Sequence, residues 1–389
     1  MLRRVGFSIL FLSVFGCSTD TGIKIGLVVP LSGEFSIYGS PVRKGVELAL
    51  EELASSGTTI ELEVIDTEGN AEKAAEAMET CIDSGALAVI GGVTSVEALE
   101  MVGIADRTDH VLLSPSASSP QLTGISRNFY RIFPSDALEG TTMGNFAYQR
   151  LELESAVIVA KEETYAKGNQ EVFRAEFERN GGRVLETIQY PEGAGDFSGL
   201  LERVVSLDPP GVYLAAFADD IGAMINELRS QGYRGKILTT SAFASPEAIE
   251  QVGENAEGVF LTQAVFEVNS EDPKIQAFVA AYREKYGFAP GLYAAHGYDA
   301  MMVLAQAIAD NGAGLASDLW KSMRSLRDYT GVTGAVQFDE RGDVQKFPRV
   351  YVVQNGNLVD YISEIEKKRK ELLEQLRALQ EAQRARSGN

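Results

Sequence analysis

Ile25-Gly26-Leu27-Val28-Val29-Pro30 begins the alternation of strands and helices that decides the fold. This short apolar run ends at a proline, as a buried strand does, and the stretch Pro41–Ala54 that follows carries apolar residues at helical spacing. The pattern repeats with strands predicted at Ile60–Ile65, Ala88–Ile90 and Val111–Leu113 and helices at Ala71–Ser84 and Val96–Arg107. Such a series predicts a parallel sheet with helices on both faces.

The same alternation begins again near residue 156. Strands are predicted at Ala156–Val159, Val184–Ile188, Val212–Ala216 and Lys236–Leu238, and helices at Asn169–Arg179, Phe197–Val205 and Ile221–Gln231. The chain is therefore predicted to be an α/β protein with two doubly wound parallel-sheet lobes. Because ligands bind beyond the carboxyl ends of parallel strands, we expect a binding cleft between the lobes.

The sequence after residue 264 returns to helical patterns and closes with strands near 335–338 and 350–353, which indicates more than one crossing between the lobes at a hinge. We expect one lobe to comprise residues 24–134 and 264–342, and the other residues 135–263 and 343–360. Residues 361–389 form a highly charged helical extension with Ile365, Leu372, Leu376 and Leu379 on one stripe. This helix either packs back on the acidic body or forms a short coiled coil or partner-docking helix.

The first residues are typical of an export signal. Met1-Leu2-Arg3-Arg4 precedes an apolar run that is too short to span a bilayer, so residues 1–16 are predicted to be a signal peptide. Val14-Phe15-Gly16-Cys17 resembles the lipobox of bacterial lipoproteins, which implies a lipid anchor on Cys17; an ordinary secretory signal is the alternative. Ser18 follows in place of an aspartate, which favours the periplasmic face of the outer membrane in a cell with two membranes.

Composition excludes several classes of function. The 389 residues hold 35 Lys+Arg and 55 Asp+Glu, a net charge of −20 that repels nucleic acid. Two histidines and two cysteines are too few for an ordinary zinc site, so we expect no metal and no cofactor. Hydrolase, metalloprotease and phosphate-loop motifs are missing from the sequence, which favours a binding protein over an enzyme.

Hydroxyl side chains gather where two neighbouring strands of the first lobe end. Ser95 follows the strand ending at Ile90 and is a natural helix cap, with neighbouring backbone amides that favour an anion. One unit later, the loop Ser114–Pro120 brings Ser116 and Ser118 to the end of the next strand. These serines could merely cap helices, but two such loops side by side favour a polar ligand site.

An ordered set of segments resembles the leucine/isoleucine/valine-binding family of type I periplasmic binding proteins. The segments include Val29-Pro30-Leu31-Ser32-Gly33, Ser114-Pro115-Ser116-Ala117-Ser118, Tyr130-Arg131-Ile132-Phe133-Pro134-Ser135-Asp136 and His296-Gly297-Tyr298-Asp299. The resemblance covers about residues 24–360 and implies a ligand held between the lobes. The residues that it implies, together with the strand-end serines, are Tyr38, Ser95, Ser116, Ala117, Ser118, Tyr165, Phe217 and Ser241. Core packing is the alternative for Tyr165 and Phe217.

One position departs from the family pattern. Amino-acid binders of this family place an acidic residue after the strand matching Lys236–Leu238, opposite the ligand's ammonium group, and this chain has Ser241 there. A buried ammonium without a counter-ion is costly, so the ligand is predicted to be an uncharged or anionic relative of an amino acid, such as an amide or a carboxylate. Asp219 and Asp220 could substitute, although helix capping explains them equally.

The resemblance implies a lipid-anchored solute-binding protein of an ABC importer. Its partners would be a small amino-acid-like ligand, an ABC permease and the membrane that holds its anchor. The alternative is a lipoprotein sensor or regulatory interaction module that uses the same fold, with the charged C-terminal helix docking on a partner.

Overall fold

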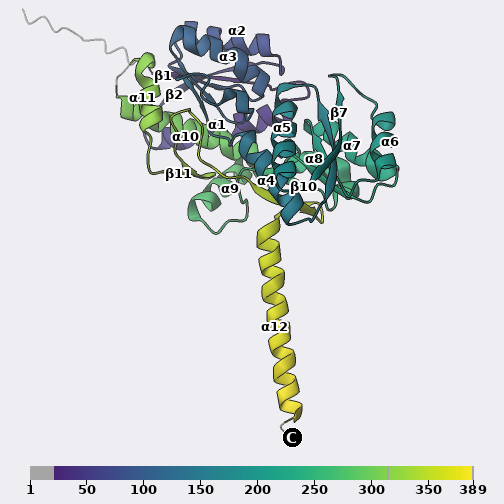
Figure 1. The fold of residues 1–389 in the computed structure, drawn as a ribbon. Coiled ribbons are helices and arrows are strands. Elements are labelled where there is room, and N and C mark those ends of the chain that lie inside the picture. Colours follow the sequence, from purple (N-terminus) through teal and green to yellow (C-terminus); the bar gives the residue numbers. More distant parts are fainter. Residues whose placement is uncertain (1–21, 313–314, 388–389) are drawn as a thin grey trace, which may run out of the picture.

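The computed structural model describes residues 22–312 and 315–387. Two separate sheets carry most of the chain, and a long C-terminal helix extends from the body (Figure 1). Of the sequence-based predictions, the signal peptide at residues 1–16 and the lipidated Cys17 lie outside the described residues. The two-lobed α/β architecture predicted from the alternation of strands and helices is confirmed.

The first sheet is five-stranded, wholly parallel and ordered β2-β1-β3-β4-β5. Its strands are β1 (Ile23–Val29), β2 (Ile60–Asp66), β3 (Ala88–Gly91), β4 (Val111–Ser114) and β5 (Phe129–Arg131). Helices α2 (Ala71–Asp83) and α3 (Ser95–Thr108) cover one face, where Val28 is buried. Ile25 and Leu27 point to the opposite face, which α1 (Ser36–Ser55) covers. The alternation along β1 thus divides the core into two layers.

Helix α1 packs closely against α10 (Leu292–Asn311), a segment far away in the sequence. A Cβ atom on Gly45 would lie 1.9 Å from the Ala294 carbonyl oxygen, and one on Gly297 would lie 2.3 Å from the Val42 carbonyl oxygen. Both glycines are therefore required for this contact. Helix α1 begins five residues before the predicted start at Pro41, and the added turn carries Tyr38.

The second sheet has seven strands in the order β14-β13-β10-β9-β8-β6-β7. Its strands are β6 (Ser155–Lys161), β7 (Arg183–Tyr190), β8 (Gly211–Ala215), β9 (Lys236–Thr239), β10 (Phe260–Gln263), β13 (Arg349–Gln354) and β14 (Asn357–Asp360). The last two run antiparallel to their neighbours, and the other pairs are parallel. Its helices are α4 (Asp136–Gln149), α5 (Thr164–Arg179), α6 (Ser198–Leu207), α7 (Ala218–Ser230) and α8 (Pro246–Val252).

Helix α4 has no counterpart among the predicted elements, because its sequence is rich in poor helix formers. Gly140 and Gly144 lie against α5: a Cβ atom on either would approach the backbone nitrogen of Phe173 or Phe177 to 2.9 Å or 3.0 Å. These glycines lower helix propensity but allow the two helices to pack closely. Tertiary packing therefore stabilises a helix that local propensity does not predict.

The chain crosses between the two sheets three times. The first crossing leads from β5 to α4, the second follows β10, and the third precedes β13. Between the second and third crossings the chain forms α9 (Pro273–Tyr286), α10, α11 (Leu319–Ser325) and the hairpin of β11 (Tyr329–Gly331) and β12 (Gly334–Val336). More than one crossing was predicted, and this is confirmed. The residue ranges predicted for the two lobes remain a prediction.

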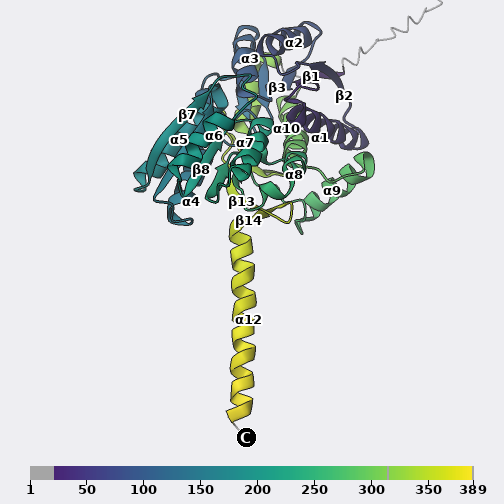
Figure 2. The ribbon, with the colours of Figure 1, turned by 90° about the vertical axis from the view of Figure 1, so that its right-hand side faces the viewer.

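The final helix, α12 (Tyr361–Ser387), projects away from the body in both views (Figures 1 and 2). It contacts the rest of the molecule at its base, where the Tyr361 ring meets Phe146 at 4.8 Å and Phe260 at 5.8 Å between ring centroids. The prediction of a C-terminal helix is confirmed, whereas the alternative in which this helix packs back on the acidic body is wrong. In the described part of the chain, no helix is long and apolar enough to cross a bilayer.

Candidate ligand-binding site

A small cavity of about 30 Å³ lies between the two lobes. It is lined by Tyr38, Val93, Thr94, Ser95, Ser116, Ser118, Phe133, Tyr165, Phe217, Ser241, Ala242 and Tyr293. Seven of the eight predicted ligand-binding residues are therefore brought together at one place, and Ala117 lies buried beside them without lining the cavity. The volume is only a few times the minimum that holds one water molecule, so a larger ligand requires the lobes to open further.

Two strand-end loops form the first-lobe side of the cavity. Thr94, rather than Ser95, caps α3: its hydroxyl accepts from the Glu97 backbone N–H, and the Glu97 carboxylate accepts from the Thr94 backbone N–H in return. Ser95 begins the first turn of the helix, where backbone N–H groups without helical partners favour an anion. The expectation that Ser95 is the cap is therefore wrong by one residue, but the place of the helix N-terminus is as predicted.

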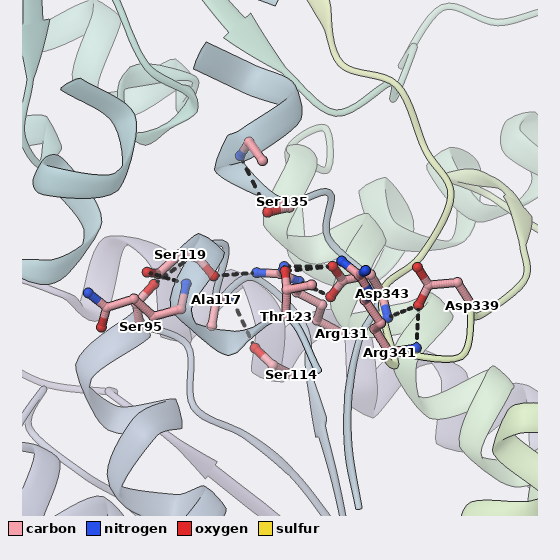
Figure 3. A network of polar contacts seen from close by, with 12 residues as sticks. Ser95, Ser114, Ala117, Ser119, Thr123, Arg131, Ser135, Asp339, Arg341 and Asp343 are labelled. Atoms are coloured by element: carbon pink, nitrogen blue, oxygen red, sulfur yellow. Dashed lines mark hydrogen bonds and ion pairs between the residues drawn. The ribbon is translucent and has the colours of Figure 1, made fainter. Parts of the chain in front are cut away.

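The serine hydroxyls also hold these loops together. The Ser95 hydroxyl accepts from the Ser119 backbone N–H at 3.1 Å (Figure 3), and the Ser116 hydroxyl donates to the Val93 carbonyl oxygen at 2.8 Å. Each side chain retains further capacity, because a serine hydroxyl has one donor and two acceptor positions. Ser95 can still donate a hydrogen bond to a ligand, and Ser116 can still accept one.

Arg131 fixes the Ser114–Pro120 loop from behind (Figure 3). Its fully buried guanidinium pairs with both Asp343 carboxylate oxygens, from Nε at 2.7 Å and from Nη2 at 2.9 Å, and donates to the Ser119 carbonyl oxygen at 2.8 Å. Bidentate pairs of this kind are directional as well as strong. The segment before β13 is thereby connected to the loop that carries Ser116 and Ser118.

Aromatic rings form the opposite wall. The rings of Tyr165 and Phe217 are stacked with centroids 5.2 Å apart, and Tyr38 contacts Tyr293 edge-on at 5.0 Å. Tyr165 comes from α5 and Phe217 precedes α7, so both belong to the second lobe, whereas Tyr38 lies on α1 of the first. Such rings give a ligand a large contact area at low entropic cost.

The lobes are closed on one another at this site. The Tyr38 hydroxyl accepts from the Ala218 backbone N–H at 2.9 Å and donates to the Ala242 carbonyl oxygen at 3.2 Å. Lys161 of β6 lies 3.2 Å from Asp220 and 4.0 Å from Glu34, which precedes α1. Asp220 is therefore held by a lysine in its own lobe.

Phe133 and Tyr293 line the cavity although the sequence analysis did not select them. Tyr293 opens α10 and donates its hydroxyl to the Ser241 carbonyl oxygen at 3.2 Å, while Phe133 lies where the chain first crosses between lobes. Tyr293 falls on an apolar helical stripe that is typical of core residues. The local sequence around Tyr293 does not distinguish it from a core residue.

Two buried carboxyl groups lie behind the cavity wall, on α4. Asp136 and Glu139 are fully buried, and burial raises the pKa of both side chains; the mutual repulsion of the pair raises the pKa of Glu139 further. Asp136 faces the side chains of Ser118 and Asn169, and Glu139 faces Ser241 and Thr262. Among the described residues, none of the four carboxyl oxygens has a hydrogen-bond partner of good geometry.

His296 and Cys81 are buried groups with a structural role. Burial lowers the pKa of His296 to about 3, so this ring is neutral at physiological pH, and its Nδ1 lies 2.9 Å from the Leu292 carbonyl oxygen. Cys81 is a fully buried free thiol whose pKa burial raises to about 12, so it is an unreactive core residue.

Residues 22–357 match the sequence family described as periplasmic binding protein. The chain belongs to this family. The match spans both lobes and ends before α12, so the family resemblance predicted from ordered motifs is confirmed.

Relatives from several bacteria support the same assignment. The leucine-, isoleucine-, valine-, threonine- and alanine-binding protein of Pseudomonas aeruginosa is 24% identical over 341 residues, which cover 86% of this chain and 90% of that protein. Among solved structures, a leucine-binding protein LivK from Thermotoga maritima is 31% identical with a TM-score of 0.83, covering 87% of this chain and 97% of that one. The Streptococcus pneumoniae LivJ protein in complex with isoleucine is 26% identical with a TM-score of 0.81 over 87% and 97% of the two chains. This periplasmic binding protein is thus similar in sequence and fold to binding proteins for branched-chain amino acids.

Proposed function

We propose that this protein is the solute-binding component of an ABC importer and that it traps an amino acid or an amino-acid-like molecule between its lobes. The observation that carries the proposal is the cavity in which Ser95 and Ser118 of one lobe meet Tyr165, Phe217 and Ser241 of the other. Ligand contacts with both lobes exist only in the closed state, so binding shifts the population toward closure. The closed form then docks on the permease.

The names of the relatives support an amino-acid ligand. The Thermotoga maritima protein is named for leucine, and the Pseudomonas aeruginosa protein for leucine, isoleucine, valine, threonine and alanine. The cavity is compatible with this class because a helix N-terminus and hydroxyls suit a carboxylate, while aromatic rings suit a side chain.

Calorimetric titration of the purified mature protein tests the proposal. The panel contains glycine, L-alanine, L-leucine, L-leucinamide, 4-methylpentanoate and glutarate, which vary the size and charge of the ligand separately. Native mass spectrometry of freshly purified protein checks in parallel for a co-purified small molecule. Saturable binding of at least one amino-acid-like compound is expected; a protein that binds none and carries no small molecule would contradict the proposal.

We also propose that Cys17 carries the lipid that holds the protein at the membrane, on the periplasmic face of the outer membrane where two membranes exist. The lipobox-like Val14-Phe15-Gly16-Cys17 supports this. Metabolic labelling with an alkyne palmitate analogue tests it: the full-length protein should be labelled and sediment with membranes, and a Cys17→Ser variant should do neither. A labelled Cys17→Ser variant would contradict the assignment.

A second candidate function is a sensor or interaction module, and α12 favours it. This 27-residue helix extends from the body, and Ile362, Ile365, Leu372, Leu373 and Leu376 are exposed along it. Truncation after Ser363 keeps Tyr361 in its contact with Phe146 and removes the projecting part. If the truncated protein loses a partner that co-isolates with the full-length protein, while its ligand affinity is unchanged, the result would support an interaction module. If the truncated protein keeps the same partners but no longer supports ligand import, the result would favour transport as the only function.

A further inference from the structure

Asp136 and Glu139 form a buried acidic pair one layer behind the cavity wall. They lie one helical turn apart on α4, and each faces the cavity through one hydroxyl residue, Asp136 through Ser118 and Glu139 through Ser241. Their positions in the first turn of the helix are favourable for a carboxylate, but complete burial is not.

No cation in the described residues neutralises this pair. Arg131 faces Asp136, but its Nε and Nη2 atoms donate to Asp343 and its Nη1 atom donates to the Ser119 carbonyl oxygen. Lys161 pairs with Asp220 instead. The two carboxyl groups therefore stand beside the ligand cavity without a positively charged partner of their own.

A second, independent observation points from the pair into the cavity. The Tyr165 ring lines the cavity and is 5% exposed, yet its hydroxyl has no hydrogen-bond partner among the described residues and faces both carboxyl groups. The Thr240 hydroxyl lies beside Tyr165 and the Thr262 hydroxyl lies beside Glu139, and within the part of the chain that the structure describes neither makes a hydrogen bond of good geometry. Because buried polar groups are nearly always satisfied in native proteins, the Tyr165 hydroxyl is a position at which a ligand group in the cavity can complete the network.

We propose that the Asp136–Glu139 pair makes this cavity selective for ligands with a cationic head, such as the primary ammonium group of a free amino acid. The inference rests on the proposed function and names the ligand class for it. Ser241 and the Tyr165 hydroxyl accept from the ammonium, and the carboxyl groups behind them supply the counter-charge in a low-dielectric environment. Ser95 and the N-terminus of α3 hold the carboxylate at the opposite side of the cavity.

The pair thereby replaces the acidic residue that the sequence lacks at Ser241. The prediction of an uncharged or anionic ligand follows from Ser241 at the strand-end position and from the helix-capping positions of the two aspartates of α7. In the fold, the carboxyl groups of Asp136 and Glu139 on α4 lie on the Ser241 side of the cavity, although α4 is not the element in which the family places its acidic residue. Asp136 and Glu139 are positioning residues, because they act on the ligand through Ser241, Ser118 and Tyr165.

Two matched ligand pairs test the proposal by calorimetry: L-leucine with 4-methylpentanoate and L-alanine with propionate, whose members differ only in the ammonium group. The wild-type protein should prefer the ammonium member of a pair. Glu139→Gln, which keeps the shape and removes the charge, should weaken that member by about 10- to 100-fold and leave the deaminated acid unchanged or tighter. Glu178→Gln removes an exposed carboxylate on α5 and should change neither.

A second readout separates a charge effect from a packing defect. Binding of a cation lowers the pKa of the pair, so the wild-type protein should release protons on binding L-leucine or L-alanine, detected as a dependence of the observed heat on the buffer's ionisation enthalpy. Glu139→Gln should reduce this release, and Asp136→Asn provides an independent second variant. An unchanged ammonium preference and unchanged proton release in Glu139→Gln would overturn the inference while leaving the proposed function intact. Failure of the wild-type protein to bind any of the four compounds would overturn the inference; it would overturn the proposed function as well only if the remaining panel compounds also fail to bind and no small molecule co-purifies.

Discussion

The Tyr38 hydroxyl on α1 accepts a 2.9 Å hydrogen bond from the backbone N–H of Ala218, which lies in the other lobe. The same hydroxyl donates to the Ala242 carbonyl oxygen, so the Tyr38 side chain makes two hydrogen bonds to the backbone of the other lobe. Tyr38 is 4% exposed, and burial raises the pKa of its hydroxyl, which stays protonated and able to donate. It is therefore a contact that distinguishes the closed state from an open one.

Replacing Tyr38 by Phe removes both cross-lobe hydrogen bonds and keeps the ring against Tyr293. The closed state should lose about 1–3 kcal/mol relative to the open state, and ligand affinity should fall accordingly, because binding requires closure. Small-angle X-ray scattering of the ligand-free variant should show a larger radius of gyration than the wild-type protein. An identical scattering curve together with unchanged affinity would show that Tyr38 does not hold the lobes closed.

Ser95→Ala and Ser118→Ala test the first-lobe side of the cavity. Each substitution removes a hydroxyl that lines the cavity and should weaken ligand binding by about 1–3 kcal/mol, because a buried polar ligand atom then lacks its partner. Calorimetry with the ligand found in the panel measures the change. Ser206→Ala, on an exposed part of α6, is the matched control and should have no effect; equal affinities in all three variants would remove this site.

The sequence predicts the two sheets well because parallel βα units leave a strong periodic signal. The serine loops are predicted for the same reason, since a cleft residue follows directly from where a strand ends. Helix α4 and its buried carboxyl pair are not predictable in this way. Gly140 and Gly144 weaken the helical signal, and an Asp and a Glu in a first turn look like ordinary exposed dipole partners. Their burial depends on how α5, β10 and β13 pack against α4.

Asp343→Asn tests the anchor behind the serine loop. The change leaves the fully buried Arg131 guanidinium without its carboxylate, and loss of one partner of a buried ion pair costs about 3–5 kcal/mol. Chemical denaturation should show this loss of stability. Because the loop carrying Ser116 and Ser118 is held through Ser119, ligand affinity should fall as well. Asp339→Asn in the adjacent turn, which accepts from the Arg341 and Asp343 backbone N–H groups, is the milder control.

The acidic pair also predicts how stability depends on pH. A carboxyl group whose pKa is raised in the folded state keeps a proton there that the unfolded chain has already released. The free energy of unfolding therefore falls as the pH rises from about 4 through the raised pKa, and the penalty is fully present above it. His296 acts in the opposite direction below about pH 6.5, because its folded-state pKa is lowered to about 3. The stability difference between wild type and variant is thus the informative quantity.

Glu139→Gln should become increasingly favourable, relative to the wild-type protein, as the pH rises from 5 to 8. The change in relative stability should be about 1.4 kcal/mol for each unit by which the pKa of Glu139 is raised. Apart from each other, Asp136 and Glu139 face the charged and titratable groups of Arg131, Glu163, Tyr165, Tyr213 and Tyr293. The tyrosines have raised pKa values and stay neutral over this range, so they do not alter the sign. Urea denaturation at pH 5, 6.5 and 8 measures the trend in ligand-free protein, with Glu178→Gln as the exposed control. A stability difference that is constant with pH would mean that Glu139 does not titrate differently in the folded and unfolded states.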